Sequence, residues 1–187
     1  VKDYKKRILE IGNEDYITVD KQLRFIDELV EFPLGEFILK NRGTNGYWTD
    51  YMIEHQYKNR FNGTDSDGRS LTNLERIFLD RFPLVVATQQ RAVHFSRIIQ
   101  SHVREDAVIA SLPCGLMRDL LVLDFSGIKN FQLIGSDIDN KSINYAQKLA
   151  ERYQLSAHVE FYQSDAWNQP FENHFTLLTS NGLNVYE

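Results

Sequence analysis

The stretch that decides the fold is Leu133-Ile134-Gly135-Ser136-Asp137-Ile138-Asp139, in which an apolar run ends in an acidic residue. The residues after it favour a helix, so the stretch is typical of a strand, a turn and a helix in succession. A glycine-containing turn, Pro113-Cys114-Gly115, lies upstream, and its glycine stands 22 positions before Asp137. In a parallel sheet, this spacing places a carboxylate where ribose hydroxyls can donate hydrogen bonds to it. The stretch therefore predicts a nucleotide-cofactor site in an α/β domain.

Strand and helix patterns alternate through residues 106–187. Apolar runs predict strands at 107–112, 131–136, 158–163 and 174–179, and amphipathic spacing predicts helices at 116–125 and 140–153. Asp139 or Asn140 is expected to cap the second of these helices. Such alternation predicts a parallel sheet with right-handed crossovers, and we expect the strand order 3-2-1-4.

Residues 1–105 show helical spacing instead. Asp20 is the expected N-cap of the first clear helix, and Thr72 with Glu75 forms an expected capping box. The predicted helices are 21–32, 34–41, 48–56, 72–81 and 84–103, and residues 62–70 have the composition of a loop. We therefore expect two domains, a helical cap over 1–105 and a Rossmann-like sheet over 106–187.

Composition limits the classes of partner and location that the protein is expected to have. Residues 1–105 carry 16 basic and 16 acidic side chains, whereas residues 106–187 carry 5 and 10, so the net charge of −5 lies in the second part. No basic stripe appears, which argues against a nucleic-acid partner and favours a small-molecule substrate. The apolar runs are too short to span a membrane. One cysteine and no apparent secretory leader predict a cytoplasmic location.

Four blocks of residues 107–187 resemble, in order and spacing, the first half of a class I S-adenosylmethionine-dependent methyltransferase domain. They are VIASLPCGLMRDLL (108–121), LIGSDIDNKSINYAQ (133–147), VEFYQSDAW (159–167) and HFTLLTSNGLNVY (174–186). The resemblance implies methyl transfer from S-adenosylmethionine on a Rossmann-like sheet of seven strands. The chain would then be a fragment without strands five to seven, inactive alone. Its fourth strand would expose an edge, which predicts oligomer contacts or poor solubility.

The resemblance also implies which residues hold the cofactor. Asp137 would hold the ribose hydroxyls, Ile138 would pack on the adenine, and Asp165 would accept from the adenine amino group. The full set of cofactor-binding residues is Ser111, Pro113, Cys114, Gly115, Asp137, Ile138, Asp165, Ala166 and Asn181. The first block departs from the family pattern, because an acid and Gly-x-Gly-x-Gly are replaced by residues that keep only the central glycine. Backbone carbonyls, Ser111 or Asp119 must then recognise the amino group of the cofactor.

Other interpretations of the same residues remain open. Asp165 could simply stabilise an Asx turn and have no ligand. Cys114 could simply be a small buried residue with no chemical role. We assign no catalytic base, and the five histidines lack metal-ligand spacing. A non-catalytic relative that binds a protein partner would explain the reduced glycine loop. An NAD(P)-dependent oxidoreductase would need Gly-x-Gly-x-x-Gly after the first strand, which this sequence lacks.

Overall fold

The computed structural model describes residues 1–172, 174–181 and 183, with the side chains of residues 58 and 59 left out. The chain divides into two compact units, Val1–Thr88 and Gln89–Glu187. The last helix before the sheet ends at Gln100, and the first strand begins at Ala107. The change from helices to strands therefore lies near residue 105, where the sequence predicts it. The compact units divide earlier, within that helix, and the Gln100 side chain near the end of the helix bonds to the backbone N and O of Asp124 in the second unit.

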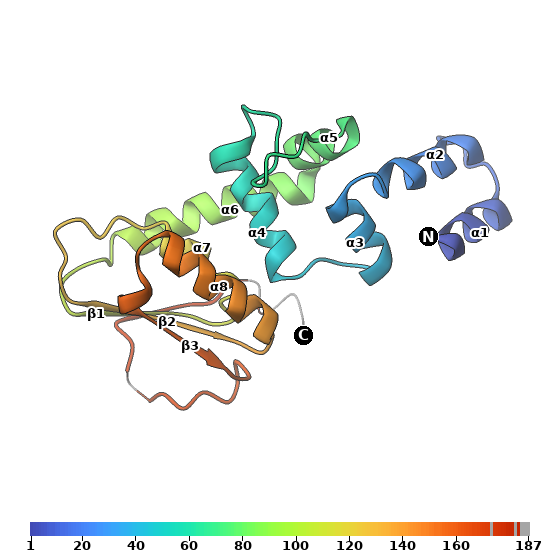
Figure 1. The fold of residues 1–187 in the computed structure, drawn as a ribbon. Coiled ribbons are helices and arrows are strands. Elements are labelled where there is room, and N and C mark those ends of the chain that lie inside the picture. The colour runs from blue at the N-terminus through green and yellow to red at the C-terminus, as the bar shows by residue number, and fades with distance from the viewer. Residues whose placement is uncertain (173, 182, 184–187) are drawn as a thin grey trace. The chain divides into compact units, whose positions relative to one another are not determined.

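The first unit is helical. Its helices are α1 (Lys2–Ile11), α2 (Val19–Leu29), α3 (Pro33–Asn41), α4 (Gly46–Glu54), the π-helix η1 (His55–Asn59), α5 (Asn73–Arg81) and the start of α6 (Pro83–Gln100), as Figure 1 shows. Pro33 occupies the first turn of α3, where its missing N–H costs nothing. The capping box of Thr72 and Glu75 is confirmed at the start of α5. The N-cap of α2 is Thr18 and not Asp20, because the Thr18 side chain accepts from the Lys21 amide.

An apolar core fills the first unit. Its buried members come from every helix between α2 and α6 and from the loop before α5: Ile26, Leu29, Phe32, Leu34, Leu39, Met52, Leu71, Leu79 and Val85. Trp48 packs against this cluster, with its ring centroid 5.7 Å from that of Phe37 and 5.4 Å from that of Tyr51. The indole therefore contributes to helix packing.

A buried ion pair fastens the loop 62–70 to this core. The guanidinium of Arg69 donates to both carboxylate oxygens of Glu75, at 2.8 and 2.7 Å, and the Glu75 side chain is fully buried. Tyr51 donates to the same carboxylate at 2.7 Å, and Asp65 pairs with the guanidinium on its other side at 2.9 Å. Burial, followed by this hydrogen bond, raises the pKa of the Tyr51 hydroxyl far above its ordinary value. The loop is thus held by charge-assisted bonds.

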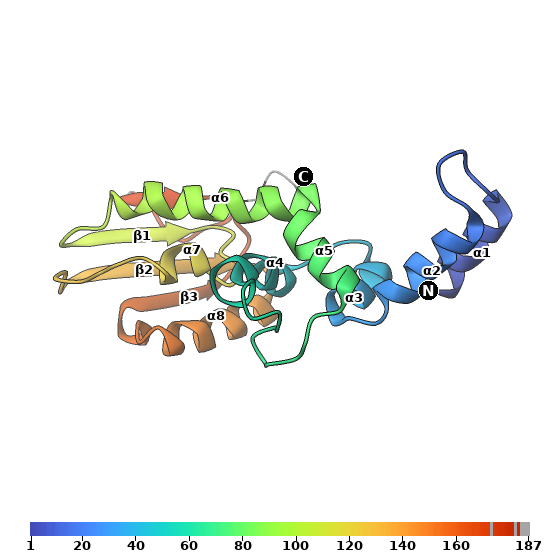
Figure 2. The same cartoon turned by 90° about the horizontal axis from the view of Figure 1, so that it is seen from above.

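The second unit contains a parallel sheet. Its strands are β1 (Ala107–Ser111), β2 (Phe131–Asp137), β3 (Val159–Gln163) and β4 (Leu177–Thr179), and its helices are α7 (Arg118–Leu121), α8 (Asn140–Arg152) and the 3₁₀ turn η2 (Ser156–His158), after the end of α6. The strand order is β3-β2-β1-β4, and all three pairings are parallel, as predicted. Figure 2 shows the strands β1, β2 and β3 side by side, with α8 beside β3.

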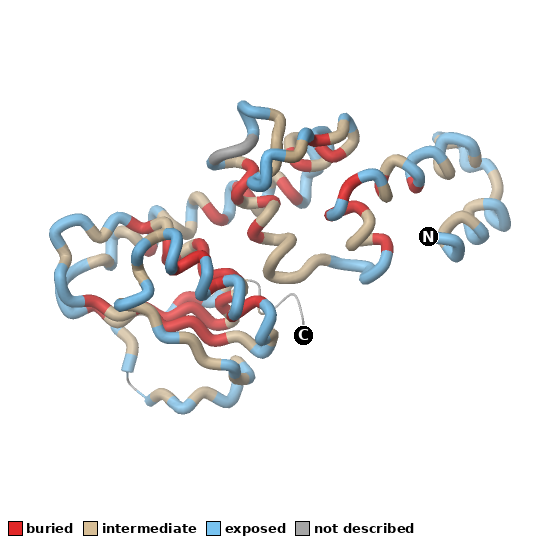
Figure 3. Tube along the Cα trace, in the orientation of Figure 1, coloured by how far each residue is buried: buried red, intermediate tan, exposed pale blue. Residues whose placement is uncertain are grey.

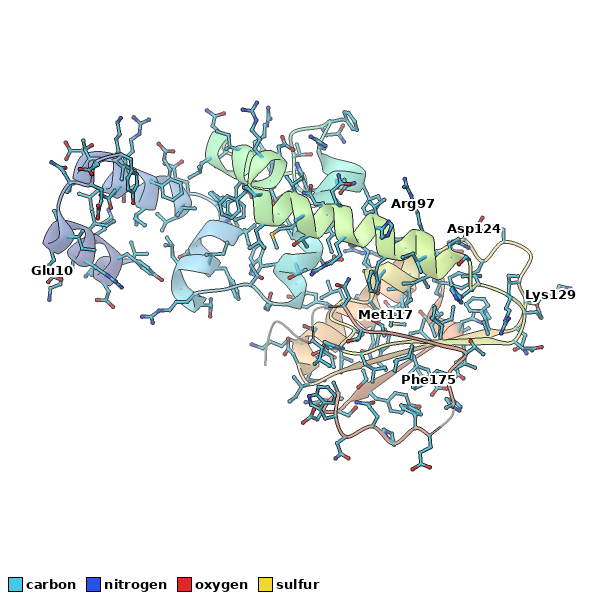
Figure 4. The ribbon with its side chains drawn as sticks, turned by 180° about the vertical axis from the view of Figure 1, so that it is seen from behind. Glu10, Arg97, Met117, Asp124, Lys129 and Phe175 are labelled. Atoms are coloured by element: carbon cyan, nitrogen blue, oxygen red, sulfur yellow. The ribbon has the colours of Figure 1, made fainter. Side chains whose placement is uncertain are left out.

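The two faces of the sheet carry different cores. Figure 3 shows the buried residues concentrated on β1, β2 and the inner side of α8. Helices α7 and α8 pack together over one face. On the other face, Phe175 packs against Ala110, Leu112 and Ile134, and Figure 4 labels it on the side of the sheet away from Met117. No helix among the described residues is long and apolar enough to cross a membrane.

Helix α7 is shorter than the helix predicted over 116–125. Asp124 accepts from the amide of Ser126, which makes an Asx turn, and the side chain of Gln100 occupies the backbone N and O of Asp124. Because of these bonds, the backbone of Asp124 does not take part in helical hydrogen bonding, and the helix ends at Leu121. The predicted strand over 174–179 is likewise shorter, since β4 begins at Leu177.

Removing the N-cap of α8 should destabilise the second unit. Asp139 accepts from the amides of Lys141 and Ser142 and from the Ser142 hydroxyl, at 2.8 to 3.2 Å, and the hydroxyl bond above all lowers the pKa of Asp139. We expect Asp139→Ala to lower the free energy of unfolding by about 1 kcal/mol in urea titrations at neutral pH.

The same pKa direction sets the pH dependence of that loss. A carboxyl group whose pKa is lower in the folded state stabilises the fold above its ordinary pKa, and this contribution disappears as pH falls through the folded value. The difference between wild type and Asp139→Ala should therefore shrink in acid. Glu151→Ala, an exposed change on the same helix, should stay within about 0.5 kcal/mol of wild type. Equal stability of Asp139→Ala and wild type at neutral pH would contradict the capping role.

Breaking the buried pair should unfold the first unit more easily. Arg69→Met leaves the Glu75 carboxylate buried without its cation. We therefore expect the free energy of unfolding, measured in urea titrations, to fall by about 3 kcal/mol. The double variant Arg69→Met/Glu75→Gln should recover part of that loss because the charge is gone. Arg24→Met removes an exposed pair with Glu28 and should cost less than about 1 kcal/mol. An Arg69→Met loss no larger than the Arg24→Met loss would refute the role of the pair.

Candidate functional site

The loop between β1 and α7 is folded back onto the end of β2. Gly115 and Met117 adopt left-handed backbone angles, with φ of 51° and 59°, and the Leu112–Pro113 peptide bond is cis. The amide of Cys114 donates to the carbonyl of Ser136 at 2.8 Å, which ties the loop to the neighbouring strand. Gly115 adopts this angle without strain because it has no Cβ, whereas Met117 adopts a similar angle although it carries one.

Asp137 and the glycine turn lie together, as the 22-residue spacing predicts. The Gly115 amide donates to Asp137 Oδ2 at 2.8 Å, and the Asp139 amide donates to Oδ1 at 2.9 Å. The Asp137 side chain is half-buried at the carboxyl end of β2. A carboxylate oxygen can accept two hydrogen bonds, so each oxygen retains capacity for one further donor. The arrangement can therefore receive two vicinal hydroxyls without losing its internal bonds.

Gly135 allows this loop to approach the sheet closely. A Cβ at this position would stand 2.8 Å from the ring of Phe161 and 2.9 Å from Met117 Sδ. Both distances are shorter than van der Waals contact, so a larger residue would force the side chains of Phe161 and Met117 to move. Met117, labelled in Figure 4, is itself 1% exposed.

Two residues of the predicted set, Ser111 and Cys114, are buried in the sheet and its loop. Ser111 is 1% exposed and pairs across the sheet with Gly135 and Thr179. Burial, and then the negative charges of Asp137 and Asp119, raise the pKa of the Cys114 thiol far above its ordinary value. A raised pKa disfavours the reactive thiolate, which supports the interpretation of Cys114 as a small buried residue.

The loop after β3 contributes Asp165 and Ala166. Asp165 is exposed, and its Oδ1 accepts from the Trp167 amide at 3.0 Å, as expected for an Asx turn. The Ser164 amide donates to the carbonyl of Asp137 at 3.1 Å, so this loop begins next to the end of β2. Ala166 is half-buried, and Ile138, which follows Asp137, is 70% exposed.

Asn181 lies at the same edge of the sheet. It follows β4, whose last residue Thr179 pairs with Ser111 and donates to the carbonyl of Ala110 at 3.0 Å. Asn181 is half-buried. The rest of the fourth block, at 182 and 184–186, lies outside the described residues. The structure thus brings together the turn after β1, Asp137, the Asp165 loop and Asn181 at the carboxyl edge of four parallel strands.

Three residues near this edge were not among those selected from the sequence. The Trp167 side chain is 71% exposed. Its place directly after Asp165 and Ala166 is a signal in the sequence that could have selected it. Arg118 is 6% exposed and donates to the Tyr153 hydroxyl at 3.3 Å. Ser164 shares a hydrogen bond of 2.7 Å with Ser136, a contact between strands that spacing alone does not predict.

A hollow lies at the opposite edge of the sheet. It measures about 580 Å³ and is lined mainly by polar residues near the amino ends of β1, β2 and β3: Asp106, Asn130, Gln132, His158 and Glu160. Ligands of parallel sheets bind at the carboxyl ends, so we assign the site to the Asp137 edge despite this hollow. No cluster of metal-ligating side chains occurs among the described residues.

Comparison with known proteins finds a solved structure that matches this chain along its whole length. No family model and no curated protein matches this chain. A solved structure from Bordetella parapertussis, described as a possible exported protein, matches 100% of this chain with 38% sequence identity and a TM-score of 0.88. This chain spans only 59% of the length of that neighbour. The neighbour therefore shares the α/β fold along the whole of this chain, with its N-terminal helices.

A second solved structure, described as the O-MT of StiE, residues 961–1257, matches 51% of this chain and 33% of its own length. Its sequence identity of 18% and TM-score of 0.39 are too low to carry an argument. The cytoplasmic location expected from the sequence is contradicted by the first comparison, because that neighbour is described as a possible exported protein. A single cysteine forms no internal disulfide in any compartment, so its presence did not distinguish between locations.

Filling the space at Gly135 should disturb the site. We expect Gly135→Ala to lower the free energy of unfolding by about 1 kcal/mol or more and to shift the NMR signals of Met117 and Phe161, because its Cβ overlaps both side chains. Gly43→Ala is the matched control, since nothing lies within 4 Å of a Cβ at that position. A Gly135→Ala variant as stable as Gly43→Ala would show that the loop does not need this close approach.

Proposed function

We propose that this chain is the cofactor-binding part of an S-adenosylmethionine-dependent methyltransferase that acts on a small molecule. The observation that carries the proposal is the Asp137 carboxylate, which ends β2 beside the Gly115 turn and keeps acceptor capacity on both oxygens. In open parallel sheets, ligands bind outside the carboxyl ends of the strands where the order reverses. Strand β1 lies between β2 and β4, so the order reverses beside β1, and the turn after β1 donates to this carboxylate through the Gly115 amide.

The residues around the carboxylate fit a nucleoside. Ribose hydroxyls would donate to Asp137, and the exposed side chain of Ile138 would cover one face of the adenine. The Ala166 amide would lie near the edge of the base. Asn181, on the loop after β4, would lie near the methionine end of the cofactor.

Recognition of the amino group of the cofactor falls to the loop after β1. Burial removes Ser111 from the candidates, which leaves backbone carbonyls and Asp119. The negative charges of Asp137 and Asp119 both raise the pKa of the Cys114 thiol, so two carboxylates act on this turn. Two negative charges complement a ligand that carries a sulfonium and an ammonium group.

S-adenosylmethionine, when bound, supplies a methyl group that is already activated by its sulfonium. The protein then needs to hold the acceptor in line and to exclude water. We assign no general base. The sequence Ser180-Asn181-Gly182-Leu183, in place of the Asn-Pro-Pro-Tyr of many methylases of amino groups, supports a small-molecule acceptor.

A second candidate function is a binding protein without catalysis. The glycine loop keeps only Gly115, and the neighbour that matches this whole chain is described as a possible exported protein. S-adenosylmethionine is made inside cells, so an exported relative would meet little of it. An oxidoreductase that uses a nicotinamide cofactor has the least support, because the loop lacks the further glycines that a pyrophosphate needs.

Calorimetric titration with S-adenosylhomocysteine tests the proposal. We expect the chain to bind it with micromolar affinity, about −8 kcal/mol. Asp137→Asn should weaken binding at least about tenfold, because the hydroxyls lose a charged acceptor while the amide oxygen still accepts from Gly115.

Glu151→Gln, which removes an exposed carboxylate from α8, serves as the control and should bind like wild type. Absence of binding to the folded chain would overturn the cofactor assignment and favour the non-catalytic binding protein. Equal affinity of Asp137→Asn and wild type would show that the cofactor binds elsewhere.

A further inference from the structure

We propose that Asn62 is a site of spontaneous covalent modification, at which the side-chain amide becomes aspartate or isoaspartate through a succinimide. The inference concerns the helical unit and is independent of the proposed function. The sequence has Asn-Gly pairs at 45–46, 62–63 and 181–182, and the structure describes both residues of the first two. Glycine has no Cβ to shield its backbone nitrogen, so an Asn side chain reacts most readily when glycine follows it.

Asn62 lies in an exposed turn at the start of the loop 62–70. Its side chain is exposed, and the preceding Phe61 is 93% exposed. Within the part of the chain that the structure describes, no hydrogen bond holds the Asn62 side chain. The side chain is therefore able to rotate toward the nitrogen of Gly63, and water reaches the product of that attack.

A cation lies against the reacting peptide. A Cβ at Gly63 would stand 2.5 Å from Arg76 Nη2 and 3.5 Å from Arg76 Cζ, so the guanidinium lies next to the Gly63 backbone. A nearby positive charge favours the deprotonated form of a group, and Arg76 thereby eases loss of the proton from the Gly63 amide. The same charge complements the carboxylate of the product.

The reaction consumes only water. The deprotonated Gly63 nitrogen attacks Asn62 Cγ, and the new C–N bond closes a five-membered succinimide ring. The side-chain nitrogen leaves as ammonia, taking up the proton that the Gly63 amide gave up. Water then opens the ring. Attack at Cγ gives aspartate, and attack at the main-chain carbonyl carbon gives isoaspartate, in which the backbone continues through Cβ.

The fold protects Asn45, although glycine follows it as well. Asn45 is the N-cap of α4, and its Oδ1 accepts from the Trp48 amide at 3.1 Å. Gly46 is the first residue of that helix. Asn45 must therefore lose its capping bond before its side chain can be attacked, whereas Asn62 has no such bond to lose.

Isoaspartate at position 62 would loosen the loop 62–70. It adds one carbon to the backbone before Gly63, whose carbonyl accepts from the Leu71 amide at 2.9 Å. Leu71 belongs to the core of the first unit, and Thr64 forms a bridge with Ser70. The modification therefore acts where the two ends of the loop meet.

Peptide mass spectrometry of the full chain, incubated folded in mildly alkaline buffer, tests the site. Conversion of the amide to an acid adds about 1 Da to a peptide. We expect this increase in the peptide that contains Asn62, and several-fold less of it in the peptide that contains Asn45. In concentrated urea, where the capping bond is lost, the two peptides should react at similar rates. An unmodified Asn62, or equal modification of Asn45 and Asn62 in the folded chain, would overturn the site.

Variants of Arg76 test the role of the cation. Arg76 is exposed, so its replacement should leave the fold intact, which urea titrations check. Arg76→Gln should slow the modification of Asn62 several-fold, and Arg76→Lys should restore much of the rate because it keeps the charge. An Arg76→Gln variant that reacts as fast as wild type would overturn the role of Arg76.

Discussion

The hydrogen bond from the Gly115 amide to the Asp137 carboxylate holds the candidate site together. It joins the turn after β1 to the end of β2, and the bond from the Cys114 amide to the Ser136 carbonyl supports it one residue earlier. A charge-assisted bond of this kind is about twice as strong as a neutral one, so the turn and the carboxylate behave as one structure. The left-handed angle at Gly115 and the absent side chain at Gly135 follow from this constraint.

The two compact units are stabilised by different means. The first unit has its loop 62–70 fastened by the pair of Arg69 and Glu75. In the second unit, residues 106–187 carry the acidic excess of the chain, and two of their carboxylates, Asp119 and Asp137, raise the pKa of Cys114 at the turn. The excess is thus partly concentrated at the carboxyl edge of the sheet, where a cationic ligand would meet it.

Much of the second unit could be predicted from the sequence because its signals are local. The apolar run ending in Asp137 and the cap at Asp139 required only neighbouring residues, and alternation of strands and helices gave the order β3-β2-β1-β4. The early end of α7 could not be predicted, since it depends on Gln100, 24 positions before Asp124.

The central claim is that the carboxyl edge around Asp137 binds a nucleoside cofactor, and amide NMR spectra of the chain titrated with S-adenosylhomocysteine test it most directly. The account predicts that the amide signals of Gly115, Asp139 and Ala166 shift together and give one dissociation constant, because all three lie at that edge. Shifts confined to residues around Asn130 and His158, at the opposite edge of the sheet, would contradict the account.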